Sequence, residues 1–156
     1  MTPLTELLLY EAARAQLVEE KIKPLLQENR VIIADRFFDS TTAYQGYGRS
    51  ISLIDIQTLN TLVCKNAVPD RTYILSISWE ESRKRRHEIS RQNDRMENQH
   101  QNFFAKIKQG FSELAQKEPQ RILLLNGEQS LKTLQKIILQ DALQVIKNKQ
   151  VRALKS

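Results

Sequence analysis

The stretch VIIADRFFDSTTAYQGYGR, residues 31–49, decides the fold that this sequence predicts. Residues 31–34 are apolar and mostly β-branched, which is typical of a short strand covered on both faces. Asp35 and Arg36 then follow the carboxyl end of that strand. Because ligands bind beyond the carboxyl ends of strands in open parallel sheets, we expect these two residues to face a crevice.

Two further segments, residues 72–78 and 121–125, are predicted as buried strands. Amphipathic patterns between and around the strands predict five helices, at residues 5–29, from Ser52 onward, and at 80–90, 99–116 and 130–147. Alternating strands and helices favour an α/β fold with a parallel sheet flanked by helices. Because a helix comes first and no phosphate loop follows a strand, we expect the first strand and its loop to be missing.

Two predictions concern particular helices. Ser52 and Asp55 have the spacing of a capping box at a helix start. In the first helix, one apolar stripe is expected to face the core, formed by Leu4, Leu8, Ala12, Ala15, Ile22 and Leu26.

The composition indicates one globular domain over residues 1–156, with 40% hydrophobic and 27% charged residues. No apolar run approaches the roughly 20 residues that cross a bilayer, and residues 1–6 lack the basic start of a signal peptide. A lone cysteine, Cys64, is expected as a small core residue at a helix end and favours a reducing cytoplasm. The net charge of +6, including a basic tail at 147–156, favours an anionic partner.

Several side chains have chemistry that suits a nucleotide. Asp35 could hold a metal ion or its water, and Arg36 could bind a phosphate, although a surface ion pair would look the same. Tyr10 and Arg14 are four residues apart, so they share a helix face and could stack on a base and bond its carbonyl, or form an ordinary flank pair.

The residues after Arg36 extend this chemistry. Hydroxyl and amide groups at residues 39–45 can read the edges of a planar base, and Gly46 and Gly48 could let the backbone approach a ligand. The arginine-rich stretch 83–95 could neutralise a transferring phosphate or serve as a solvated face. The sequence contains no Gly-x-x-x-x-Gly-Lys-Ser/Thr motif and no metal-ligand spacing of His and Cys.

Taken together, these segments resemble the bacterial thymidylate kinases. Residues 5–16 are similar to the family's helix before its Asp-Arg strand, and residues 35–49 match its signature nearly residue for residue. Pro69-Asp70, residues 94–97 and Phe103-Phe104 match later landmarks, so the resemblance runs from about residue 5 to 146. It implies the P-loop nucleoside-monophosphate kinase fold, transfer of the γ-phosphoryl group of ATP to dTMP with Mg²⁺, and a homodimer formed through helices.

The resemblance also implies a role for each candidate residue. The thymine site would consist of a stacking ring, a guanidinium and two groups at the base edge: Tyr10, Arg14, Thr41 and Gln45. Tyr44 would pack against the sugar, Arg36 would hold the dTMP phosphate, and Asp35 would lie near Mg²⁺ and the acceptor phosphate.

The segment 85–95 would be the lid over ATP. One of its arginines would serve the transition state, and the choice among Arg85, Arg91 and Arg95 stays open.

The sequence departs from the family pattern at several places. The family's first strand, P-loop and phosphate-binding segment would precede residue 1, so we expect an N-terminally truncated domain that is inactive or impaired. Ser76 stands where an acid is usual, Trp79 where a proline is common, and Asn126-Gly127 replaces an Asp-Ala pair.

Two other interpretations remain open. The first is a non-enzymatic nucleotide- or nucleic-acid-binding remnant, and the second is a subunit completed by a partner. Nucleic acid is disfavoured because the tail at 147–156 is separated in the sequence from the aromatic residues.

Overall fold

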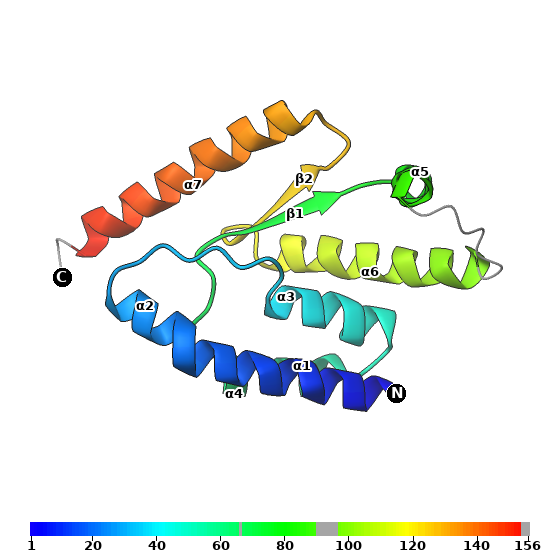
Figure 1. The fold of residues 1–156 in the computed structure, drawn as a ribbon, viewed down its shortest axis with the longest axis horizontal. Coiled ribbons are helices and arrows are strands. Elements are labelled where there is room, and N and C mark those ends of the chain that lie inside the picture. Colours follow the sequence, from blue (N-terminus) through cyan, green and yellow to red (C-terminus); the bar gives the residue numbers. More distant parts are fainter. Residues whose placement is uncertain (66, 90–96, 154–156) are drawn as a thin grey trace. The chain divides into compact units, whose positions relative to one another are not determined.

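The computed structural model describes residues 1–65, 67–89 and 97–153 (Figure 1). The chain divides into two compact units. One comprises Met1–Val68 and Met96–Leu114, and is here called the helical unit. The other comprises Pro69–Arg95 and Ala115–Ser156, and is called the sheet unit because it contains both strands.

The helical unit begins with one long helical segment. It consists of α1 (Pro3–Leu17), a π-helical turn η1 (Val18–Ile22) and α2 (Lys23–Gln27). Thr2 caps the start, since its side chain accepts a hydrogen bond from the amide of Thr5 at 3.3 Å. The helix predicted over residues 5–29 is confirmed.

The buried face of this segment differs from the predicted stripe. Leu7, Glu11, Val18 and Ile22 are buried, whereas Leu4 remains 57% exposed and Leu8 49% exposed. The prediction holds for Ile22 and was wrong for Leu4 and Leu8. Leucines at three successive positions supply two adjacent apolar faces, and periodicity alone does not say which face is covered.

Residues 31–34 form no strand, so this prediction was also wrong. Ile33 is 93% exposed and Val31 is 65% exposed. A strand needs a neighbouring strand for its backbone groups, and no ladder hydrogen bond joins residues 31–34 to other described residues. The local pattern is apolar and β-branched, but the presence of a pairing strand depends on distant parts of the chain.

The signature stretch after residue 37 is helical. It forms α3 (Phe38–Thr41) and a π-helix η2 (Thr42–Gly48), followed by α4 (Leu53–Cys64). Ser52 caps α4 by accepting from the amide of Asp55 at 3.4 Å, as the capping box predicts. Cys64 ends α4 in the core with 2% exposure, and burial raises the pKa of its thiol to about 11.

Two glycines of η2 pack against protein rather than lie open to a ligand. A Cβ atom at Gly46 would lie 2.7 Å from Cδ2 of Leu53, and one at Gly48 would lie 2.6 Å from Cε2 of Phe103. The idea that these glycines admit a ligand to the backbone is therefore wrong, because side chains occupy that space.

Helix α6 (Glu97–Lys117) supports η2 through an aromatic contact. A Cβ at Gly110 would come within 2.6 Å of the ring of Tyr47, whose hydroxyl donates to Glu113 at 2.6 Å. Burial, and then the hydrogen bond to this carboxylate, raise the pKa of Tyr47 to about 12.

This pKa predicts alkaline instability. In the unfolded chain the phenol titrates near its model value of 10.0, so the unfolded state loses the proton first. The contribution of Tyr47 is complete below pH 10 and is lost as the pH rises through about 12. We expect urea unfolding at stepped pH to show stability falling over this window, and Tyr47→Phe to reduce the fall. An identical pH profile for Tyr47→Phe would contradict the assignment.

The sheet unit contains two parallel strands, β1 (Thr72–Ser76) and β2 (Ile122–Asn126). Thr72 pairs with Ile122, and Ser76 pairs with Asn126. Helices α5 (Trp79–Ile89) and α7 (Leu131–Ala153) belong to the same unit. The predicted strands at 72–78 and 121–125 and the three later helices are thus confirmed, although α7 continues to Ala153, beyond its predicted end at 147.

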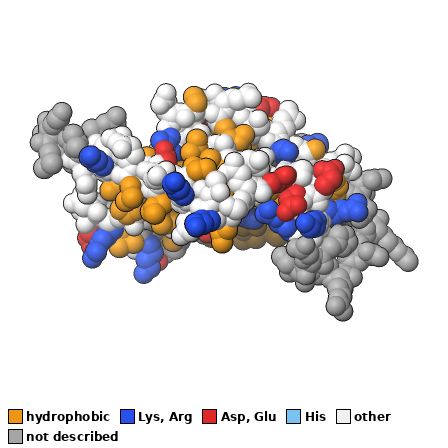
Figure 2. Space-filling view, turned by 90° about the horizontal axis from the view of Figure 1, so that it is seen from above, with side chains coloured by type: hydrophobic (Ala, Val, Ile, Leu, Met, Phe, Trp, Pro, Cys, Tyr) orange, Lys and Arg blue, Asp and Glu red, His pale blue; other side chains and the backbone are white. Residues whose placement is uncertain are grey.

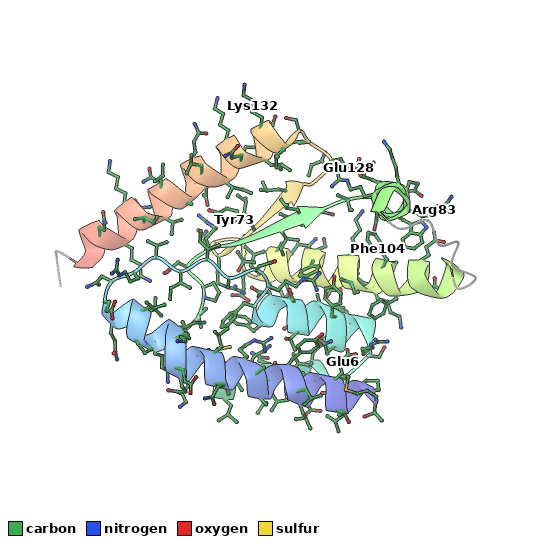
Figure 3. All side chains as sticks on the ribbon, viewed as in Figure 1. Glu6, Tyr73, Arg83, Phe104, Glu128 and Lys132 are labelled. Atoms are coloured by element: carbon green, nitrogen blue, oxygen red, sulfur yellow. The ribbon has the colours of Figure 1, made fainter. Side chains whose placement is uncertain are left out.

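Helix α7 is tied to β1 through Asp141. Its carboxylate accepts from Arg71 Nη2 at 3.2 Å and from the hydroxyl of Tyr73, which Figure 3 labels, at 2.7 Å. Residues 147–153 of the basic tail continue α7 rather than hang free.

Figure 2 looks onto the side of α7 and shows Lys and Arg side chains separated by hydrophobic ones. Leu131, Leu139 and Leu143 are among the exposed residues of this helix. In the part of the chain that the structure describes, no helix is both long and apolar enough to span a membrane.

Candidate functional site

Arg14 is the most constrained of the residues that the sequence predicts for the site. Its Nη1 donates to the carboxylate of Glu11, and its Nη2 donates to the Thr41 hydroxyl at 2.6 Å. The guanidinium also lies 5.5 Å from the centre of the Phe37 ring. Its side chain is only 10% exposed, so α1 and α3 hold a charged group almost buried.

Glu11 completes this arrangement and was not foreseen. Its side chain is 4% exposed, and Oε2 is buried without a hydrogen-bond partner among the described residues. A buried charge is tolerated only when it is paired, so the ion pair with Arg14 keeps both side chains in place. The spacing of three residues on one helix could have revealed this pair from the sequence.

Gln45 is held in a second polar cluster. Its amide nitrogen Nε2 donates to Oε1 of Glu6 at 2.8 Å, and Arg49 donates to Oε2 of the same carboxylate at 3.5 Å. Figure 3 labels Glu6 on α1. Gln45 is 5% exposed, so its head group has little freedom. No sequence signal reveals this contact, because Glu6 and Gln45 are 39 residues apart.

The ring of Tyr44 contacts Arg36 and two aromatic rings of α6. The Arg36 guanidinium lies 5.3 Å from the centre of the Tyr44 ring. Phe103 and Phe111 meet the same ring edge-on, with centroids 6.3 and 6.2 Å away. Tyr44 is therefore fixed as a platform beneath an exposed cation.

The backbone of Arg36 is unusual. Its φ of 67° lies in the left-handed region, which costs a side-chain-bearing residue about 1–2 kcal/mol. Strain of this kind is concentrated at functional sites, and here it falls on the predicted phosphate ligand. Asp35, its neighbour, is exposed.

The structure unites most of the predicted base and sugar residues. Thr41, Tyr44 and Gln45 lie on one continuous helical segment, and Arg14 and Arg36 contact members of it. Tyr10 lies on α1 with 55% exposure, and no contact with these groups is recorded for it.

Arg85 belongs to the sheet unit. It donates to Glu81 at 2.6 Å and to the carbonyl of Gly127, just after β2, at 3.2 Å. Glu128 in the same loop accepts from the amide of Ser78 at 2.7 Å. Arg91 and Arg95 lie outside the described residues.

The donor set for a metal ion is small. No group of three His, Cys, Asp or Glu side chains is found where the structure describes the chain. Mg²⁺, however, is usually held by one or two carboxylates together with substrate phosphates and water. The exposed carboxylate of Asp35 beside Arg36 fits that mode of binding, with the phosphates supplied by substrate.

A surface hollow on α4 is a poor candidate for a binding site. It is lined by Ile54, Gln57, Thr58, Thr61 and Leu62 of α4. All five residues belong to one helix, and its inward residues Ile56, Asn60 and Cys64 are buried.

Comparison with known proteins decides the family. A family model described as thymidylate kinase matches residues 1–138. The chain belongs to the thymidylate kinase family. It is 37% identical over 139 residues to the thymidylate kinase of Thermoanaerobacter sp. (strain X514), which covers 89% of this chain and 68% of that protein. It is 38% identical over 146 residues to the Kosmotoga olearia thymidylate kinase, covering 93% and 69%.

A solved structure confirms the fold class. The thymidylate kinase from Ehrlichia chaffeensis matches with a TM-score of 0.63 and 33% sequence identity. The match covers 80% of this chain but 59% of that one, so the chain spans less than two thirds of that thymidylate kinase. The parallel sheet and its helices thus have the α/β fold of the family, as the sequence predicts.

Proposed function

We propose that the helical unit binds dTMP and that the chain acts in the transfer of the γ-phosphoryl group of ATP to dTMP. The observation that carries the proposal is the group of side chains on and around the helical segment α3–η2. Arg14 is oriented by Thr41, Gln45 is immobilised, and Arg36 lies over Tyr44. These side chains are already in position to contact the base edge, the sugar and the phosphate of a nucleotide.

In this proposal each side chain has one task. Arg14 and Gln45 bond the edge of thymine together with Thr41, and Tyr10 stacks on its face. Tyr44 packs against the deoxyribose, and Arg36 binds the phosphate through charge-assisted hydrogen bonds. Preorganised groups of this kind bind more tightly because less entropy is lost on binding.

Phosphoryl transfer depends on positioning and on charge neutralisation. Asp35 would hold Mg²⁺ through its carboxylate or a water, and the ion would supply positive charge to neutralise the phosphates. Arg85 is the described candidate for the lid cation, with Arg91 and Arg95 as the others. Because the sequence contains no Gly-x-x-x-x-Gly-Lys-Ser/Thr motif, we propose turnover far below that of a full thymidylate kinase.

Calorimetric titration of the purified chain tests the proposal. We expect dTMP to bind more tightly than dCMP or dAMP, because of these three bases only thymine presents a carbonyl beside a ring N–H donor. A coupled assay for ADP release should show little turnover. Equal affinities for dTMP and dAMP would contradict the binding proposal, and ADP release at a normal kinase rate would contradict the impairment.

We also propose a homodimer through α1 and α4, which pack together in the helical unit. Leu4, Leu8, Ile54 and Leu62 on these helices are 49–76% exposed, an unusual number of large apolar groups for two helices facing water.

Leu8→Glu is expected to place a charge in that interface and convert dimer to monomer in sedimentation velocity. Leu139→Glu on α7, also exposed, serves as the control and should leave the dimer intact. A monomeric parent chain would contradict the proposal.

The net charge of +6 supports a second candidate, a remnant that binds nucleic acid. The sequence of α7 contains basic residues but no aromatic residue that could stack on a base, which argues against nucleic-acid binding. DNA affinity that falls steeply with salt would favour this candidate. With either function, the single cysteine supports a cytoplasmic location.

A further inference from the structure

The orientation of the Gln45 amide is determined by its partner. A carboxylate without a proton only accepts hydrogen bonds, so the NH₂ end of Gln45 must face Glu6. The distance of 2.8 Å from Nε2 to Oε1 agrees with this assignment. The carbonyl oxygen Oε1 of Gln45 must then point the other way, and no donor to it is recorded among the described residues.

This polarity matters for the base that is read. The imide edge of thymine offers an N–H donor at N3 and a carbonyl at C4. The corresponding edge of cytosine offers an acceptor at N3 and an amino donor at C4. In the proposed site, the carbonyl of Gln45 and the N–H donors of Arg14 complement the first edge and oppose the second.

We infer that Glu6 is a specificity-determining positioning residue, which selects an imide base by fixing the amide of Gln45 with its carbonyl toward the ligand. The inference rests on the proposed function, because it needs Gln45 at the base edge. Glu6 itself does not touch the nucleotide. Arg49 holds the second oxygen of Glu6 at 3.5 Å and lies 4.9 Å from the centre of the Phe103 ring, so the carboxylate is itself anchored.

Glu6→Gln tests the inference because it keeps the size of the side chain but can both donate and accept. Gln45 is then free to turn, and its NH₂ can face N3 of cytosine. We expect the preference for dTMP over dCMP, measured by calorimetry, to fall roughly tenfold, with dCMP binding more tightly than in the parent chain. If Glu6 had only a structural role, Glu6→Gln would lower the affinities for dTMP and dCMP by the same factor.

Glu20→Gln is the matched control. Glu20 also accepts from a glutamine amide, that of Gln16, but this pair is exposed on η1 and α1. Its substitution should leave both affinities unchanged. Glu6→Asp keeps a carboxylate that only accepts, so the preference should be retained even if both affinities drop.

The outcomes separate the two proposals. A parent chain that binds dTMP no better than dCMP overturns the proposed base site, and the inference with it. A parent chain that prefers dTMP, with the full preference kept in Glu6→Gln, overturns the inference alone. A low-field side-chain amide proton of Gln45 in ¹H–¹⁵N spectra, lost in Glu6→Gln and kept in Glu20→Gln, supports it independently of any ligand.

Discussion

Arg14→Met is expected to lower the free energy of unfolding by about 3–5 kcal/mol, the range for removing one partner of a buried ion pair. Arg14 is 10% exposed and Glu11 is 4% exposed, so the remaining carboxylate would stay buried without a cation. Oε2 of Glu11 already lacks a partner among the described residues, so no other group there would compensate for the lost cation. Urea unfolding followed by circular dichroism measures the change.

Two further variants separate the ion pair from simple packing. Glu11→Leu combined with Arg14→Met removes both charges and should recover most of the stability lost in the single variant. Lys23→Met breaks the ion pair with Glu19, whose side chains are 28% and 50% exposed, and should cost less than about 1 kcal/mol. Equal losses in Arg14→Met and Lys23→Met would show that Arg14 contributes no buried charge.

If the double variant is stable, it can also be used to test nucleotide binding. If its fold is restored, loss of dTMP binding can be assigned to the missing guanidinium rather than to unfolding. We therefore expect the double variant to unfold almost like the parent chain yet to bind dTMP more weakly, with a smaller preference over dAMP, because Gln45 and Glu6 still select the base.

The sequence predicts correctly those elements that depend on residues close together in the chain. The Ser52 cap, β1, β2 and the body of α7 follow from capping, from β-branched or leucine-rich runs and from helical periodicity. The expected strand at 31–34 failed because its formation depends on a neighbour that the local pattern does not specify.

In the candidate site, too, local features were predictable and long-range contacts were not. The chemistry of Arg14, Thr41 and Gln45 and the family resemblance predict a site at these residues, and Arg14 donates a hydrogen bond to Thr41 in the structure. Glu6 was not foreseen because its contact with Gln45 spans 39 residues. Glu11 on an apolar helix face reads as exposed by its type, since glutamate is rarely buried unless it is paired.

Arg36→Gly is expected to stabilise the chain while it destroys phosphate binding. Glycine adopts a φ of 67° without the steric cost that arginine bears, which offsets its greater freedom in the unfolded state, so we expect a net gain of about 1 kcal/mol. Loss of charge-assisted hydrogen bonds should weaken dTMP binding roughly 10- to 100-fold. Thymidine, which has no phosphate, should bind as it does to the parent chain.

Ser50→Gly supplies the matched control for this trade of stability against function. Ser50 has a φ of 59° and is exposed, so glycine should relieve similar strain there without touching the proposed site. Both variants should therefore gain stability in urea unfolding, but only Arg36→Gly should lose affinity for dTMP. If Arg36→Gly binds dTMP like Ser50→Gly, the strained arginine does not hold the phosphate, and its backbone conformation must be explained by the chain turn alone.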